Sequence, residues 1–384
     1  MSCNIILDKS DGVYLAGETL SGRVEITNCR AINIHYLTLI IKGSANVRWT
    51  ESETYKEDGK KKTKSVTYSA HEHYLNSRTI LFGQENGPSI QLPAGSHSYT
   101  FTCVLPHSLP GSMFGIYGKI EYKAQVKFDV PWTYDDNFNR VFKVLPNVDL
   151  NQEPSLRMAS VTERVQKFCS WSCTMSPAVI TITLPQTGFL RKDIIPIGIR
   201  ISNSSSVEVT GVQVKLIKSV SFKSTTPKVK ERKERTKIVF QTFNLVGRTN
   251  NRNIDINARL AIPLTPPTCE QSSSIKTIYY VEVAVYVSGC HKTTRTTTPI
   301  TIGTFPIVPD GNRNMDMSQL LGFQAMQQSA IVNQAIFSGS IASIATAPSA
   351  SVIDEEAPPP SYSEVVYGWK NNEKAYQSST ASSS

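Results

Sequence analysis

A period-two alternation of apolar and polar side chains constrains this 384-residue chain more than any other feature of its sequence. It is clearest at residues 116–128, where every second residue is apolar or glycine. That set comprises Ile116, Gly118, Ile120, Tyr122, Ala124, Val126 and Phe128. Strict alternation over this length is typical of a strand buried on one face of an antiparallel sandwich. No stretch keeps the 3.6-residue period of an amphipathic helix, so we predict an all-β protein.

The pattern occurs twice along the chain. Gly17-Glu18 followed by Ile26-Thr27-Asn28 is matched, 175 residues later, by Lys192-Asp193 followed by Ile201-Ser202-Asn203. Three further pairs of stretches follow in the same order: 39–42 with 215–218, 101–106 with 257–263, and 119–128 with 277–287. A repeat this long indicates a duplicated domain, because solenoid repeats span only about 20–50 residues. We therefore predict two tandem, immunoglobulin-like β-sandwich domains followed by a tail.

Changes of composition divide the chain into four predicted segments. Residues 1–148 form the first sandwich, and 149–168 form a linker because this region is polar and turn-prone. The alternation resumes near residue 180, so 169–309 form the second sandwich. The tail, 310–384, is rich in Ser, Ala, Gln and Asn and is predicted to be mostly disordered. Its stretch 318–347 carries scattered apolar side chains, which leave a weak helix on a partner open as an alternative.

Charge is divided unevenly along the chain. The formal net charge is +9, but the first 309 residues carry +13 and the tail carries −4. A basic body suits an anionic partner such as the cytoplasmic face of a membrane, an acidic cargo tail or nucleic acid. The seven cysteines are scattered, the first residues lack a signal-peptide pattern, and no apolar run reaches the length of a membrane span. We therefore expect a cytoplasmic protein whose thiols are reduced and buried.

No cluster of residues predicts catalysis. His71-Glu72-His73 is too short for two zinc ligands on one helical turn, and solvated strand residues are the favoured interpretation. Cys169 and Cys173 have a spacing that zinc tolerates, but no second pair accompanies them, so structural thiols are favoured. The sequence has no Gly-rich phosphate loop, nucleophile elbow or ordered Ser/His/Asp set. We predict that the protein is not an enzyme and has no catalytic residues, metal site or cofactor.

Two basic runs are candidate contacts for an anionic membrane or cargo. The first contains Lys60, Lys61, Lys62 and Lys64, and the second contains Lys228, Lys230, Arg232, Lys233 and Arg235. Each charge held near an anionic lipid surface adds about 1 kcal/mol of attraction. The alternative is a pair of solvated hairpin edges whose lysines prevent edge-to-edge aggregation. Nucleic acid is disfavoured, because the runs lack interleaved aromatic residues for base stacking.

The tail carries a short docking motif. Pro359, Pro360, Ser361 and Tyr362 fit the pattern Pro-Pro-x-Tyr and follow the acidic residues Asp354-Glu355-Glu356. Prolines favour polyproline II, whose solvated backbone a partner can bind at little ordering cost. WW domains bind this pattern with the prolines across an aromatic groove and the tyrosine in a pocket. We predict that these four residues bind a WW domain.

Several stretches of the chain resemble the α-arrestin family. The residues that carry the resemblance are Gly12-Val13-Tyr14-Leu15-Ala16-Gly17-Glu18, the stretches 43–51, 92–97 and 115–122, Pro131-Trp132, Cys169-Ser170-Trp171-Ser172-Cys173 and Asn203-Ser204-Ser205-Ser206. The resemblance covers roughly residues 1–309 and the tail motif. It implies two seven-stranded sandwiches, the arrestin N and C domains, packed end to end. It also implies an adaptor between membrane receptors or transporters and a WW-containing, HECT-type ubiquitin ligase.

The chain departs from the family at its tail and at one cysteine. Many α-arrestins carry two Pro-Pro-x-Tyr motifs, whereas here Val365-Val366-Tyr367 offers a tyrosine without the prolines. A single motif loses the avidity of a pair. A thioredoxin-binding relative uses a cysteine somewhat upstream of the position of Cys269, and residues 247–252 contain none, so that activity is not carried over. The phosphate-sensing polar core of visual and β-arrestins is not carried over either.

Together these features suggest a trafficking adaptor, cytoplasmic and peripherally bound at the plasma membrane and endosomes, that promotes ubiquitination, endocytosis and endosomal sorting of its cargo. Within the same fold class, the alternative is a retromer-type sorting subunit that recruits no ligase. From another class, the alternative is a self-assembling, membrane-associated structural protein of viral-matrix type, which the internal duplication disfavours. The sequence leaves open the identity of the cargo, the choice of ligase and any need for cargo phosphorylation.

Overall fold

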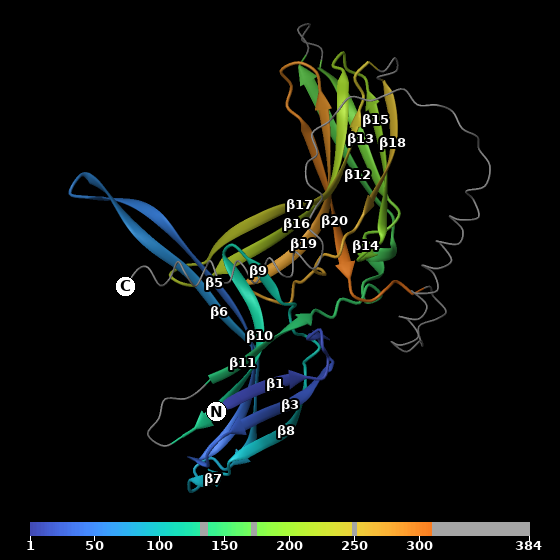
Figure 1. The fold of residues 1–384 in the computed structure, drawn as a ribbon. Coiled ribbons are helices and arrows are strands. Elements are labelled where there is room, and N and C mark those ends of the chain that lie inside the picture. Colours follow the sequence, from blue (N-terminus) through green and yellow to red (C-terminus); the bar gives the residue numbers. More distant parts are fainter. Residues whose placement is uncertain (131–136, 170–174, 248–251, 309–384) are drawn as a thin grey trace, which may run out of the picture. The chain divides into compact units, whose positions relative to one another are not determined.

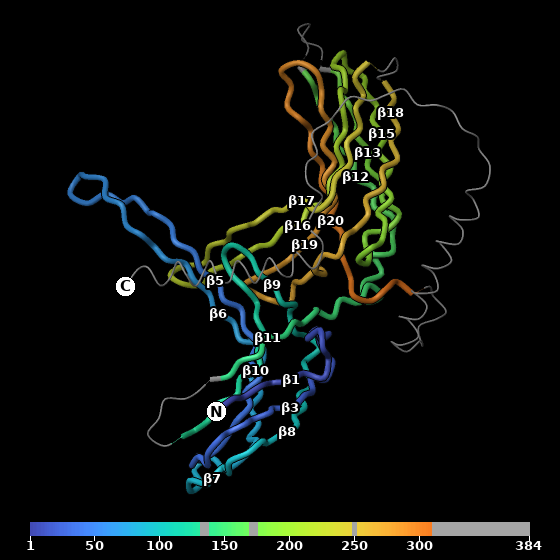
Figure 2. The backbone as a smooth tube through the Cα atoms, viewed as in Figure 1, coloured from blue at the N-terminus to red at the C-terminus, as the bar shows by residue number. Residues whose placement is uncertain are grey.

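The computed structural model describes residues 1–130, 137–169, 175–247 and 252–308, whose path is shown in Figures 1 and 2. These residues belong to one compact unit, Met1–Val308, and the second unit, Pro309–Ser384, lies outside the described residues. The described elements are β-strands except for a 3-10 helix at Pro154–Arg157. No helix among them is long and apolar enough to cross a membrane. The predicted all-β class is confirmed.

The N-terminal sandwich is built from a short sheet and a long one. The short sheet has the strand order β1-β3-β8, and the long sheet has the order β2-β11-β10-β5-β6, with β9 added on β10. Strands β4 and β7 form a separate ladder. The bounds are β1 (Ser2–Leu7), β2 (Val13–Leu15), β3 (Thr19–Asn28), β4 (Ile32–Ile34), β5 (Tyr36–Glu57), β6 (Lys60–Gly83), β7 (Ile90–Leu92), β8 (Gly95–Val104), β9 (Met113–Gly115), β10 (Gly118–Asp129) and β11 (Asn137–Leu145).

The C-terminal sandwich has the same two-sheet plan. Its sheets have the orders β12-β13-β15-β18 and β14-β20-β19-β16-β17. The bounds are β12 (Ser160–Cys169), β13 (Met175–Leu184), β14 (Gly188–Leu190), β15 (Ile194–Asn203), β16 (Val209–Ser224), β17 (Lys230–Asn244), β18 (Asn253–Ala261), β19 (Ile275–Val287) and β20 (Thr294–Gly303).

The two sandwiches repeat one topology. In each long sheet a three-residue strand, β2 or β14, pairs in parallel with the last strand of its half, and the remaining strands follow in equivalent order. The turn after that short strand is repeated as well. The Leu15 N–H donates to Glu18 Oε2 at 2.9 Å, and the Leu190 N–H donates to Asp193 Oδ2 at 2.7 Å. The predicted duplication is therefore confirmed.

The alternation locates the core of the first sandwich, but β10 starts later than predicted. Its inward side chains are at most 1% exposed: Ile120, Tyr122, Ala124, Val126 and Phe128. Ile116 was expected on the same face, yet it is 70% exposed, because β9 and β10 meet in a turn there. Gly43 makes room for Tyr122, since a Cβ at Gly43 would lie 2.3 Å from the tyrosine ring.

Two expectations about strands need correction. Residues 160–168, the second half of the predicted linker, belong to β12, which pairs with β13 along its length. The linker prediction failed there because β12 is an edge strand: Val161 and Val165 are 65% and 50% exposed, so no buried alternation marks it. Each sandwich also has more than the seven strands that the resemblance implies, because short strands such as β2 and β14 and the edge strand β12 are added.

The two sandwiches share part of one hydrophobic core. Val220 and Phe222 on β16 and Ile275 at the start of β19 are buried in the cluster formed mainly by the first sandwich. The Phe222 ring lies edge-on to Tyr117, with ring centroids 5.6 Å apart. Because aromatic burial dominates the energetics of such contacts, Phe222 ties the second sandwich to the first.

Candidate functional site

The tail motif Pro359, Pro360, Ser361 and Tyr362 lies outside the described residues, as does Cys173. The described part of the predicted site is the pair of basic runs. The first lies at the turn between β5 and β6, and the second lies along β17 and in the residues before it. These two hairpins occupy equivalent places, because β6 and β17 are the last strands of the two long sheets (Figure 1).

The first basic run lies at the tip of a long hairpin. Asp58 and Gly59 have φ values of 52° and 74°, and they form a two-residue turn in which Glu57 pairs with Lys60. Positive φ at both positions is what a tight hairpin requires, and Asp-Gly supplies it. Lys60, Lys61, Lys62 and Lys64 are all exposed. Lys62 pairs with Glu57 at 2.8 Å, whereas Lys60 and Lys61 form no ion pair among the described residues.

The second basic run contacts the first hairpin. Lys228 Nζ lies 3.1 Å from Glu53 Oε1. Lys230 and Arg232 both bind Glu51, and the guanidinium does so through Nε at 3.0 Å and Nη2 at 2.8 Å. Glu51 and Glu53 lie two residues apart on β5, so the period of a strand turns both carboxylates toward β17. Three cations of the second run, Lys228, Lys230 and Arg232, thus help to hold the two sandwiches together.

Aromatic rings enclose this charged contact. The Arg232 guanidinium lies 5.9 Å from the Trp49 ring centroid and 5.2 Å from that of Tyr117. Lys230 Nζ lies 4.9 Å from the Tyr68 centroid, and Tyr68 stacks on Trp49 with centroids 5.5 Å apart. Cations over aromatic faces gain electrostatic attraction, which increases when water is excluded. The rings therefore strengthen the ion pairs that they surround.

The contact shifts the titration of Glu51. Hydrogen bonds from Lys230 first, and then from Arg232, lower the pKa of the Glu51 carboxyl to about 2. The Trp49 indole N–H also donates to Glu51, at 2.9 Å. A carboxylate that accepts several charged hydrogen bonds keeps its charge at low pH. The pKa of Glu53 is lowered as well, chiefly by hydrogen bonds from Tyr68 and Lys228.

A second contact between the sandwiches is built around Glu72. The backbone N–H groups of Ser273 and Ser274 donate to its carboxylate at 3.2 and 3.1 Å. The Ser272 hydroxyl donates at 3.2 Å, and the Tyr74 hydroxyl at 3.0 Å. Burial raises the pKa of Glu72, but these hydrogen bonds outweigh it and the pKa is lowered. Glu72 therefore helps to hold the two sandwiches together.

The end of the second run faces solvent. Lys233 and Arg235 are both exposed on β17. Lys233 pairs with its strand neighbour Glu231 at 3.4 Å, and the Arg235 guanidinium lies 5.9 Å from the Tyr280 ring centroid. Neither contacts the first sandwich through these pairs. An external anion can reach both of them, as it can Lys228, whose side chain is 62% exposed beside Glu53.

The histidines of 71–73 bind each other. His71 Nε2 and His73 Nε2 are 2.9 Å apart, and His71 Nδ1 lies 2.6 Å from Asn46 Oδ1. No group of three or more His, Cys, Asp or Glu side chains could hold a metal ion within the part of the chain that the structure describes. Cys3, Cys103 and Cys269 are buried as expected, but Cys29 and Cys290 are exposed. Exposure of these two corrects the expectation that all thiols are buried.

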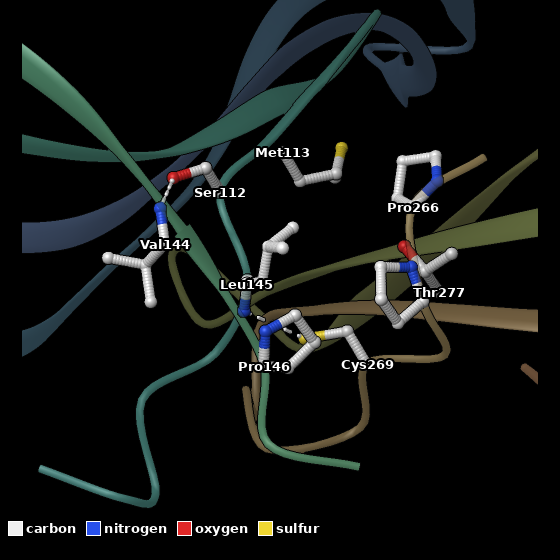
Figure 3. A pocket seen from close by; sticks show the side chains of 10 residues that line it. Ser112, Met113, Val144, Leu145, Pro146, Pro266, Cys269 and Thr277 are labelled. Carbon is white, nitrogen blue, oxygen red and sulfur yellow. Dashed lines mark hydrogen bonds between the residues drawn. The ribbon is translucent and has the colours of Figure 1, made fainter. Parts of the chain in front are cut away.

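A small cavity lies where the sandwiches meet, beside Cys269 (Figure 3). Pro146 and Met113 line it from the first sandwich, and Pro266 and Cys269 line it from the second. Its volume of about 20 Å³ suffices for one water and is far below that of a ligand pocket. Burial raises the pKa of the Cys269 thiol, which accepts a hydrogen bond from the Gly111 N–H at 3.3 Å. The thiol is structural, because a neutral buried thiol is unreactive.

Sequence reasoning found the basic runs but missed their partners. Glu51, Glu53 and Trp49 alternate along β5, and this alternation was the available signal. Nothing in the sequence alone shows that a strand near residue 51 meets one near residue 230, because that contact is formed between the two sandwiches. The aromatic residues were missed for the same reason.

Comparison with known proteins agrees with this architecture. Residues 3–151 match the arrestin (or S-antigen) N-terminal domain, and residues 175–307 match the arrestin (or S-antigen) C-terminal domain. Arrestin domain-containing protein 4 of Mus musculus is 26% identical over 318 residues, which cover 81% of this chain and 73% of the relative. Arrestin domain-containing protein 17 of Caenorhabditis elegans is 25% identical over 316 residues, covering 79% and 70%. Arrestin domain-containing protein 1 of Mus musculus is 26% identical over 221 residues, covering 57% and 47%.

These matches cover both sandwiches in order. The N-domain match includes the hairpin that carries Glu51, and the C-domain match includes the strand that carries Arg232. With two arrestin domains in tandem and relatives aligned across both of them, the chain belongs to the α-arrestin family and is an arrestin-type adaptor.

Proposed function

We propose that this adaptor links membrane-protein cargo to a WW-domain, HECT-type ubiquitin ligase, and so promotes ubiquitination, endocytosis and endosomal sorting of the cargo. The sandwiches bind the cytoplasmic segment of a receptor or transporter, and Pro359, Pro360, Ser361 and Tyr362 recruit the ligase. The observation that carries the proposal is a Pro-Pro-x-Tyr motif on an acidic tail behind two arrestin domains. The protein then works in the cytoplasm, peripherally at the plasma membrane and endosomes.

The anionic contact is assigned to the β5–β6 turn. Lys60, Lys61, Lys62 and Lys64 are exposed there, and the nearby acidic residues balance them only in part. Lys233 and Arg235 extend this role on β17. Lys228, Lys230 and Arg232 contribute mainly by fixing the two hairpins, because all three form ion pairs with Glu51 or Glu53. An anionic lipid surface or an acidic cargo segment is the ligand that such exposed cations attract.

The ligase part is tested with Tyr362→Ala in the full chain. The substitution empties the WW pocket while leaving the prolines, so binding of a recombinant WW domain should fall below detection in calorimetry. The melting temperature should stay unchanged, because the motif belongs to a different unit from the sandwiches. Tyr367→Ala is the matched control: it removes a tyrosine of the same tail that no Pro-Pro precedes. Equal WW binding by wild type and Tyr362→Ala refutes the ligase assignment.

Proximity labelling in cells separates cargo binding from ligase recruitment. Ligases should disappear from the labelled set of Tyr362→Ala, whereas membrane cargo and endosomal proteins should persist. Loss of both sets together would mean that the tail, and not the sandwiches, brings the protein to its cargo.

A further inference from the structure

Two lysines face each other in the middle of the long sheet of the first sandwich. Lys42 on β5 lies directly opposite Lys123 on β10, and Lys127 follows on the same face of β10. Directly opposed side chains have Cβ atoms only about 4.5–5.5 Å apart, so like charges there destabilise a sheet. None of these three lysines forms an ion pair within the described ranges. The fold therefore retains a repulsion that no ion pair among the described residues relieves.

Protection of a sheet edge does not explain this pair. β5 lies between β10 and β6, and β10 lies between β11 and β5, so both strands are central. Lysines that prevent edge-to-edge aggregation are needed only on outer strands. Other cations on the same face are neutralised: Lys119 pairs with Glu121 at 2.8 Å, and Arg78 pairs with Glu85 at 2.8 Å. Glu121 and Asp129 lie on the same face of β10, two residues from Lys123 and Lys127, but neither forms an ion pair with Lys42, Lys123 or Lys127 among the described residues.

The duplicated sandwich supplies an internal control. The match of 39–42 with 215–218 relates Lys42 to Lys218, which lies opposite Tyr279. The 175-residue spacing of Glu18 and Asp193 relates it instead to Ile217, which lies opposite Tyr280. Two residues away, Lys215 lies opposite Glu282, and their charged groups are 3.1 Å apart. In the second sandwich a tyrosine or a glutamate, and not a second lysine, therefore lies opposite each of these residues. The topology does not require the like-charge pair.

We propose that Lys42, Lys123 and Lys127 form a binding site for a small soluble polyphosphate, a compact molecule that carries several phosphate groups. Lys42 and Lys123 are close enough to hold one phosphate between their ammonium groups. Lys127, about 13 Å farther along the strand at ~3.4 Å per residue, reaches a second phosphate with its long side chain. All three side chains are half-buried in the face of the sheet, which suits a compact anion lying between them better than a flat bilayer. This site is separate from the ligase motif and from the β5–β6 turn.

Calorimetric titration of the full chain with inorganic tripolyphosphate tests the site. The double substitution Lys42→Gln/Lys123→Gln should weaken binding at least about tenfold, because two of the phosphate contacts are lost. The matched control is Lys167→Gln/Lys292→Gln, which removes the same charge from exposed lysines of the second sandwich that belong to neither proposed contact. It should change the affinity less than about twofold. Equal loss in the two variants would show attraction to net charge alone and overturn the proposal.

Vesicles that contain phosphatidylserine distinguish a lipid source from a soluble one. Tripolyphosphate binding that depends on Lys42 and Lys123, without vesicle binding through the same pair, supports the proposal. Vesicle binding that needs this pair and is not displaced by tripolyphosphate would assign the face to a membrane and overturn it.

A charge reversal supplies a readout that is independent of the ligand. Lys123→Glu creates an opposed Lys–Glu pair like Lys215–Glu282 in the second sandwich. It should raise the melting temperature of the ligand-free protein by about 1–3 °C while abolishing tripolyphosphate binding. A lower melting temperature with unchanged binding would make the lysine pair structural and exclude the site.

Discussion

The β5–β6 and β16–β17 hairpins occupy the same position in the two halves of a duplicated fold, yet their charges are opposite where they meet. β5 carries Glu51 and Glu53 at that place, whereas β17 and the residues before it carry Lys228, Lys230 and Arg232. Two copies of one strand pair have thus acquired complementary surfaces. The difference teaches that a basic run can stabilise the fold instead of binding an external partner. Three of the five cations of the second run form ion pairs with the first sandwich.

The largest effect is expected where the second hairpin enters the core of the first sandwich. Phe222→Ala should lower the free energy of unfolding by about 3–5 kcal/mol, because it leaves a cavity around a fully buried ring. Denaturant unfolding of the intact chain measures this. Phe240→Ala on β17, where the ring is 50% exposed, is the control and should cost less than about 1 kcal/mol. Similar losses in both variants would contradict a shared core.

The ion pairs should matter less than the core. Arg232→Ala should lower the melting temperature by about 2–4 °C, because Glu51 loses a two-point contact and Trp49 and Tyr117 lose the cation near both rings. Arg232→Lys should not restore the loss, since an ammonium cannot reproduce the planar two-point geometry. Lys233→Ala, next on the strand, should shift the melting temperature by less than about 1 °C. Equal shifts at positions 232 and 233 would remove the distinction between a cation that binds the first sandwich and one that faces solvent.

Acid should weaken the same contact in a defined pH window. The pKa of Glu51 is lowered from 4.5 to about 2 in the folded chain. The stabilisation that charged Glu51 provides is fully present above its pKa in the unfolded chain, 4.5. It is lost as the pH falls through its pKa in the folded chain, about 2, because between these two values the unfolded chain binds a proton that the folded chain does not. The melting temperatures of wild type and Glu51→Gln should therefore differ at about pH 6 and converge toward about pH 2. A difference that stays constant over this range would mean that charge on Glu51 is not what holds the hairpins.

The smallest effect is expected at the tip of the first hairpin. Lys60→Glu and Lys61→Glu should leave the melting temperature within about 1 °C of wild type, because both side chains are exposed and unpaired among the described residues. The same variants should lose affinity for anionic vesicles if the tip is the anionic contact. A clear drop in stability would show instead that the tip, like the second run, serves the fold.

The sequence by itself determined the class and the plan of the fold. Alternation such as that of Ile120 to Phe128 requires a sheet buried on one face, and the spacing of Glu18 and Asp193 marks two copies of one turn. These signals are local, so they survive without coordinates. The edge strand β12 was missed because it buries little on either face and carries no such signal.

Only the tertiary structure decided what the charges do. By sequence alone, the run Lys228, Lys230 and Arg232 could equally be a solvated sheet edge or a membrane contact. It forms a contact between the sandwiches because the fold brings Glu51 and Glu53 to it from about 180 residues away. Lys42 and Lys123 likewise look like separate solvent-facing residues until the register of β5 and β10 opposes them. Electrostatic energy depends on separation in space, which a sequence does not specify.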